Sequence, residues 1–263
     1  MPSPIYAGVP ENEAAIMERA FDLGYVQPKI PQYRTGKHIA VVGSGPAGLS
    51  VADLLNQAGH HVVVFEKDDA AGGLLRYGIP DFKLNKKVID RRIRLFEAEG
   101  IEFRYNMEVG RQITAEQLTH EFDAVVLAIG AMKPRDINVE GRELAGIHFA
   151  MDFLKQQNKI IRGEEVAVQN RIGARGKNVL VIGGGDTGSD CVGTSNRQKA
   201  TSVMQIEIMP KPPVDRASNN PWPFWPTVLK ISSSHEEGCD RRWSVNTKRF
   251  IGENGVLKQV ELV

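Results

Sequence analysis

The chain has 263 residues, of which 41% are hydrophobic and 25% are charged, and its formal net charge at pH 7 is +1. Such a composition suits a globular protein with one large domain or two modest ones, and it excludes a strong overall attraction to nucleic acid or to an anionic membrane. The sequence has no apolar run near the roughly 20 residues that span a bilayer, and its N-terminus lacks the basic and apolar regions of a secretory signal. We therefore expect a cytoplasmic protein that binds neither nucleic acid nor membranes.

Residues 1–36 are predicted to form a helical linker segment. From Glu11 to Leu23, apolar residues recur at helical spacing, which is typical of one amphipathic helix. Pro28, Pro31 and Gly36 then interrupt regular structure, so an extended connector should follow.

Residues 37–150 have the pattern of a Rossmann-type domain. A short apolar strand at His38–Val42 ends in glycines, a helix is expected at Pro46–Gln57, and a second buried strand at Val62–Phe65. This order and length fit one βαβ unit. The next expected elements are a helix at 86–99 and strands at 101–105 and 124–129.

The same pattern begins again after Gly176. We expect a strand at 178–182, a helix at 187–197 and a strand at 203–209. Pro210–Pro226 holds six prolines and two tryptophans, which favours a long ordered loop, and two strands should flank residues 252–255. Residues 151–263 are thus predicted to be a second, incomplete domain, and the fold class is α/β with two Rossmann-like, doubly wound, three-layer domains.

The first glycine-rich turn, Gly43-Ser44-Gly45-Pro46-Ala47-Gly48, fits the GxGxxG pattern between a strand and a helix. The glycines permit a tight turn and a close approach of a pyrophosphate, and the free N–H groups of the helix N-terminus suit its charge. Glu66 ends the next strand, where a carboxylate can accept hydrogen bonds from ribose hydroxyls. Together these features predict a dinucleotide site.

Two further motifs favour FAD at this turn. Gly72-Gly73-Leu74 follows shortly after Glu66, an arrangement similar to that of FAD-binding flavoproteins. Leu127–Ala131 resembles the strand-end motif that closes the FAD-binding half of such proteins.

The second turn, Gly183-Gly184-Gly185-Asp186-Thr187-Gly188, repeats the GxGxxG pattern and predicts a second dinucleotide. Glu207 near the end of the next strand could hold a ribose, as NAD would require, but strand alternation leaves the direction of its side chain open. Lys211 and Arg216 lie just beyond this strand and could hold a 2′-phosphate, which favours NADP over NAD.

Other chemistries find little support in the sequence. The two cysteines form no CxxC pair for a dithiol relay, and Cys191 is expected to be buried packing. The six histidines show no metal-ligand spacing. We nominate no metal ligand and no catalytic side chain, since hydride transfer from nicotinamide to flavin needs neither.

Several longer segments of the sequence resemble the small (beta) subunit of bacterial glutamate synthase. They are RTGKHIAVVGSGPAGLS, GGLLRYGIPDFKL, DAVVLAIGAMKPRD, GIHFAMDFL, VIGGGDTGSDC and NPWPFWP. The resemblance implies a fold of the flavoprotein disulfide-reductase or adrenodoxin-reductase type, with the second domain inserted in the first. It also implies that NADPH reduces FAD, and that iron–sulfur clusters carry the electrons to a large (alpha) subunit that makes glutamate from glutamine and 2-oxoglutarate.

The resemblance also places the ligands. It implies that Ser44, Glu66, Leu74, Lys83 and Val109 contact FAD. The first turn and the two further motifs add Gly43, Gly45, Pro46, Ala47, Gly48, Lys67, Gly73 and Gly130 as FAD-binding residues. The resemblance implies that Gly184, Gly185, Asp186, Thr187, Lys211 and Arg216 contact NADPH. The second turn adds Gly183 and Gly188.

The chain departs from this family in two ways. It lacks the cysteine-rich N-terminal domain that holds the iron–sulfur clusters, and it stops before the FAD domain resumes, so we expect a fragment of a longer protein. Two alternatives stay open: an NADPH-dependent reductase module like that of dihydropyrimidine dehydrogenase, and a non-catalytic nucleotide-binding fragment.

Overall fold

The computed structural model describes residues 9–263, and these form two compact units. The first unit comprises the described residues up to Ala71 together with Lys87–Ile129. The second comprises Gly72–Lys86 and Gly130–Val263. The ligand-based domain boundaries expected from the sequence stay a prediction, because these units are defined by packing alone.

The first unit is built on a parallel sheet of four strands in the order β3-β2-β1-β4. The strands are β1 (His38–Val42), β2 (His61–Phe65), β3 (Glu102–Arg104) and β4 (Ala124–Leu127). Strands β1 and β2 are apolar along almost their whole length because both of their faces are covered. The strand order reverses between β1 and β4, and in such sheets ligands bind at this reversal.

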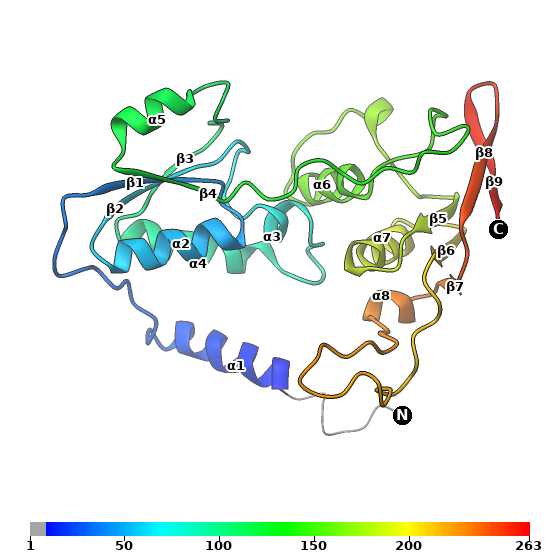
Figure 1. Cartoon of the computed structure of the whole chain (residues 1–263), viewed down its shortest axis with the longest axis horizontal. Helices are drawn as coiled ribbons and strands as arrows, with labels where there is room; N and C mark the ends of the chain where they lie inside the picture. Colours follow the sequence, from blue (N-terminus) through cyan, green and yellow to red (C-terminus); the bar gives the residue numbers. More distant parts are fainter. Residues whose placement is uncertain (1–8) are drawn as a thin grey trace. The chain divides into compact units, whose positions relative to one another are not determined.

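Helices cover both faces of this sheet. Figure 1 shows α2 (Pro46–Gln57) and α4 (Lys86–Ala98) on one face and α5 (Ala115–Glu121) on the other. The N-terminal helix α1 (Val9–Asp22) belongs to the same unit, and Glu18 on it pairs with Arg91 on α4 at 2.6 Å. The helices and strands that the sequence predicts in this region are therefore confirmed.

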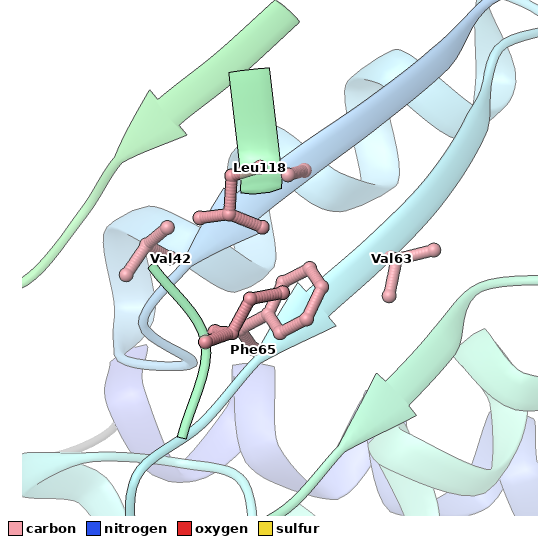
Figure 2. Packing of buried hydrophobic residues seen from close by; sticks show 6 residues of the cluster. Val42, Val63, Phe65 and Leu118 are labelled. Carbon is pink, nitrogen blue, oxygen red and sulfur yellow. The ribbon is translucent and has the colours of Figure 1, made fainter. Parts of the chain in front are cut away.

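The core beneath α5 follows the two-residue period of the strands. Val42 on β1 and Val63 and Phe65 on β2 point to the same face, where they pack against Leu118 of α5 (Figure 2). Phe65 and Leu118 are each only 1% exposed. The intervening residues of β1 and β2 are buried on the opposite face.

The second unit repeats the same design. Its parallel strands β5 (Asn178–Ile182), β6 (Ser202–Glu207) and β7 (Asp240–Trp243) lie in that order, and α7 (Asp186–Arg197) connects β5 to β6. Helix α6 (Ala150–Ile161) packs against α7 through Phe153 and Leu154. An antiparallel hairpin, β8 (Thr247–Glu253) with β9 (Val256–Leu262), follows as the sequence predicts. The remaining short helices are α3 (Leu74–Tyr77), η1 (Val168–Asn170) and α8 (Ser233–Glu236).

Six elements escaped the sequence analysis, namely α5, α6, β7 and the short helices α3, η1 and α8. Helix α5 has a capping box in which Thr114 and Gln117 satisfy each other's backbone N–H groups, a signal that could have identified it. Helix α6 was also missed. Strand β7 has the polar sequence DRRW, and only its pairing with β6 identifies it. None of the helices within residues 9–263 combines the length and the apolar character that crossing a membrane requires.

Candidate dinucleotide-binding corners

The first corner, Gly43–Gly48 with Glu66, lies where β1 gives way to α2. Gly43 has a φ of 101°, and a Cβ there would lie 2.5 Å from the Ala128 carbonyl oxygen after β4. A Cβ at Gly48 would overlap the Gly43 carbonyl oxygen. By contrast, a Cβ at Gly45 would meet no atom within 4 Å, so the corner is open beside the helix N-terminus. This open space beside bare N–H groups fits a diphosphate.

The carboxylate of Glu66 is fixed against this corner. It is 5% exposed and accepts hydrogen bonds from the Ser44 N–H at 3.1 Å, from the Ser44 hydroxyl, and from the Asp68 N–H at 2.8 Å. These donors hold a carboxylate at the end of β2, the position from which an acidic residue reaches a ribose in Rossmann folds. The structure thus brings the first turn and Glu66 together, and their contact with a dinucleotide stays a prediction.

The other residues expected to contact FAD are distributed along both units. Lys67 follows Glu66, and Val109 forms an isolated bridge with Ile113 in the first unit. Gly73 precedes α3 with a φ of 50°, and the Leu74 side chain is 59% exposed. Gly130 begins the longer segment of the second unit. Contact of any of these residues with FAD stays a prediction.

Lys83 lies in the second unit and contacts α7. Its ammonium group is 2.6 Å from an Asp190 carboxylate oxygen and donates to the Ser189 hydroxyl at 3.3 Å. Sequence reasoning did not identify Asp190 as its partner, because the two residues are far apart in the chain.

The second corner, Gly183–Gly188 with Glu207, has the same construction between β5 and α7. Gly183 has a φ of 119°, and a Cβ at Gly188 would overlap the Gly183 carbonyl oxygen. Gly185 precedes α7, and a Cβ there would again meet no atom within 4 Å. The open side of the helix N-terminus fits a second diphosphate.

A buried series of hydrogen bonds, from Gly183 through Gln205 to His235, supports the second corner. The Gln205 amide, 2% exposed, donates to the Gly183 carbonyl oxygen at 2.8 Å, and its oxygen contacts Nε2 of His235 at 2.9 Å. Nδ1 of His235 accepts from the Ser232 N–H at 3.1 Å, so the neutral ring carries its proton on Nε2. Burial, followed by the charges of Arg241 and Lys83, lowers the pKa of His235. Sequence reasoning missed this series of hydrogen bonds, because its residues come from three separate elements.

Glu207 occupies the end of β6, and the structure settles the direction of its side chain. A Cβ at Gly184 would overlap one Glu207 carboxylate oxygen and lie 3.0 Å from the carboxylate carbon. The other oxygen accepts from the Met209 N–H at 3.4 Å. Glu207 therefore faces the second corner.

Lys211 and Arg216, the two residues expected to hold a 2′-phosphate, are in contact with other groups. Lys211 lies 5.0 Å from the centre of the Trp243 ring, and Arg216 donates to the carbonyl oxygens of Asn220 and Phe224, each at 3.0 Å. Both side chains belong to exposed residues. Their role toward NADPH stays a prediction.

Both cysteines, Cys191 and Cys239, are free thiols in the second unit. Cys191 packs in the core between α7 and β5, and burial raises the pKa of its thiol to about 12. Within residues 9–263, His, Cys, Asp and Glu nowhere gather into a group of three that could hold a metal ion.

Comparisons with known proteins agree with this geometry. The family model for pyridine nucleotide-disulphide oxidoreductase matches residues 37–260. The "Glutamate synthase [NADPH] small chain" of Mycobacterium tuberculosis is 51% identical over 94% of this chain and 51% of its own length. The "Glutamate synthase [NADH]" of Schizosaccharomyces pombe is 48% identical over 97% of this chain and 13% of its own length. The resemblance to glutamate synthase small chains is confirmed, and this chain spans about half the length of the bacterial relative.

A solved structure shows the same fold. Mycobacterium tuberculosis FprA in complex with NADPH superimposes with a TM-score of 0.67 at 18% identity, over 86% of this chain and 63% of that one. The predicted α/β class with Rossmann-like units is therefore confirmed. Because the family model covers most of its length, the chain belongs to the pyridine nucleotide-disulphide oxidoreductase family.

Proposed function

We propose that this chain is the part of a glutamate synthase small chain that binds FAD at the first corner and NADPH at the second. The observation that carries this proposal is the repeated corner, in which an open helix N-terminus lies beside a carboxylate at the end of the next strand. Relatives named for NADPH-dependent and NADH-dependent glutamate synthases match nearly the whole chain.

Bound FAD would accept a hydride from NADPH and pass electrons onward. The protein's contribution is binding and orientation. Free N–H groups at the start of α2 and α7 would donate to the two diphosphates, and Glu66 would accept hydrogen bonds from the FAD ribose. This step requires no acid or base from the chain.

The further path of the electrons belongs to the proposal as well. Iron–sulfur clusters outside this chain would receive the electrons, and a large-subunit partner would use them to form glutamate from glutamine and 2-oxoglutarate. A cytoplasmic location, as expected from the sequence, is proposed with them.

Flavin content and nicotinamide-driven bleaching test the proposal directly. The purified 263-residue chain, incubated with FAD and desalted, should retain the visible absorbance of oxidised flavin, and NADPH added without oxygen should bleach it. Glu66→Gln should weaken FAD binding by about tenfold, since the ribose hydroxyls would then donate to a neutral amide oxygen and no longer to a carboxylate. Glu121→Gln, at the exposed end of α5, is the matched control and should bind FAD normally.

A chain that retains no flavin would contradict FAD binding at the first corner. A chain that retains flavin but is not bleached by NADPH or by NADH would contradict the proposed hydride transfer.

A further inference from the structure

The two corners are similar enough to be compared residue by residue. Glu66 directly follows β2 and Glu207 is the last residue of β6, and Ser44 and Gly184 each stand second in their turn. One oxygen of each carboxylate accepts from an N–H two residues later, at Asp68 and at Met209. The other oxygen lies against the second residue of the turn.

The corners differ in what occupies the space beside the carboxylate. At the first corner, both the N–H and the hydroxyl of Ser44 donate to Glu66, which is buried. At the second corner, Gly184 offers no side chain, and Glu207 is only partly buried. A Cβ at position 184 would overlap the Glu207 carboxylate where it now lies, so a larger residue there would require this side chain to move.

The charge beside the second corner is therefore negative. In a Rossmann corner, the adenosine ribose lies beside the end of the second strand, and an acidic residue there accepts from the 2′-hydroxyl. A 2′-phosphate in the same place would meet the Glu207 carboxylate, a repulsion between like charges. The nearby cations Lys211 and Arg216 are engaged with Trp243 and with loop carbonyls, respectively.

We infer that Glu207 binds the adenosine ribose at the second corner, so that the corner accepts NADH as well as NADPH and Glu207 sets their ratio. This inference rests on the proposed function, because it assigns one residue of the nicotinamide site. It makes Glu207 a specificity-determining residue and places Lys211 and Arg216 in a lesser role.

Binding titrations on the full 263-residue chain test this without any redox step. The probes are ADP-ribose and 2′-phospho-ADP-ribose, measured by calorimetry, and NADH and NADPH, measured by nicotinamide fluorescence. Glu207→Gln should weaken the binding of ADP-ribose and NADH by about tenfold, because the ribose hydroxyl would then donate to a neutral amide oxygen and no longer to a carboxylate. The same variant should bind the 2′-phosphorylated ligands more tightly, because the repulsion is removed.

Two further variants make the result decisive. Glu207→Asp keeps the charge but shortens the side chain, so it should weaken ADP-ribose less than Glu207→Gln does, and it serves as a second test if Glu207→Gln does not fold. Glu253→Gln makes the same change at an exposed position on β8 and should leave all four affinities unchanged.

Three outcomes would overturn the inference. An unchanged ratio of NADH to NADPH affinity in the folded Glu207 variants would show that the carboxylate does not contact the ribose. A wild-type chain that binds NADPH but not NADH would refute the inference while sparing the proposed function. A chain that binds none of the four probes would refute both.

Discussion

Replacing Lys83 with methionine should destabilise the second unit, because this substitution removes the cation beside Asp190. The Lys83 ammonium lies 2.6 Å from the Asp190 carboxylate, and only 26% and 10% of the two side chains are exposed. Methionine keeps the apolar length of the lysine stem, so the lost packing is small compared with the lost charge. What remains is a carboxylate on α7 with little access to water.

The size of the effect follows from this burial. Removing one partner of a fully buried pair costs about 3–5 kcal/mol. Water can still reach part of this site through the exposed quarter of Lys83, so we expect a loss of about 2–3 kcal/mol. Asp190→Asn should cost a similar amount, and the double variant should cost less than the sum of the single losses by about 1–2 kcal/mol.

Urea unfolding followed by tryptophan fluorescence is the suitable assay. All three tryptophans, at positions 222, 225 and 243, belong to the second unit, so their signal reports on that unit. The control is Lys248→Met on the hairpin, where the lysine side chain is 56% exposed and pairs with Glu261. An exposed pair contributes little, so this control should unfold at nearly the wild-type urea concentration.

The decisive quantity is the coupling between the two substitutions. A coupling below about 0.5 kcal/mol, within the range seen for independent sites, would refute the idea that Lys83 and Asp190 stabilise each other. Equal losses at Lys83 and at Lys248 would refute the role assigned to burial.

Three other predictions concern single sites. Leu118→Ala should destabilise the first unit by about 3 kcal/mol, since it leaves a cavity beneath α5, as measured by thermal unfolding. Cys191 should not react with a thiol reagent at pH 8 until urea unfolds the chain, because burial raises its pKa to about 12; rapid reaction in the folded state would contradict this. The lowered pKa of His235 means that the unfolded chain binds a proton more readily than the folded chain, so stability should fall as the pH drops below the ordinary value of 6.5. His235→Gln should reduce that pH dependence, and an unchanged pH profile would show that His235 is not its source.

The sequence alone was enough to locate both corners. A buried strand, a GxGxxG turn and a helix are consecutive segments, and their periodicity and glycine spacing are local properties. Residues 38–57 and 178–197 could thus be assigned before any packing was known, and the structure has the expected strand and helix in each. The position of Glu66 at the end of the second strand followed from the same βαβ rule, whereas its hydrogen bonds with Ser44 were seen only in the structure.

Only the tertiary structure decided how the second corner is charged. At the end of a strand, the direction of a side chain depends on the twist and on the pairing of the strand. Alternation along the sequence therefore could not decide which way Glu207 points, whereas the placement of β6 between β5 and β7 does. The partners of Lys83 and of Gln205 lie many residues away and are brought near by the packing of α7 and α8. Contacts of this kind depend on long-range packing, which local sequence patterns do not encode.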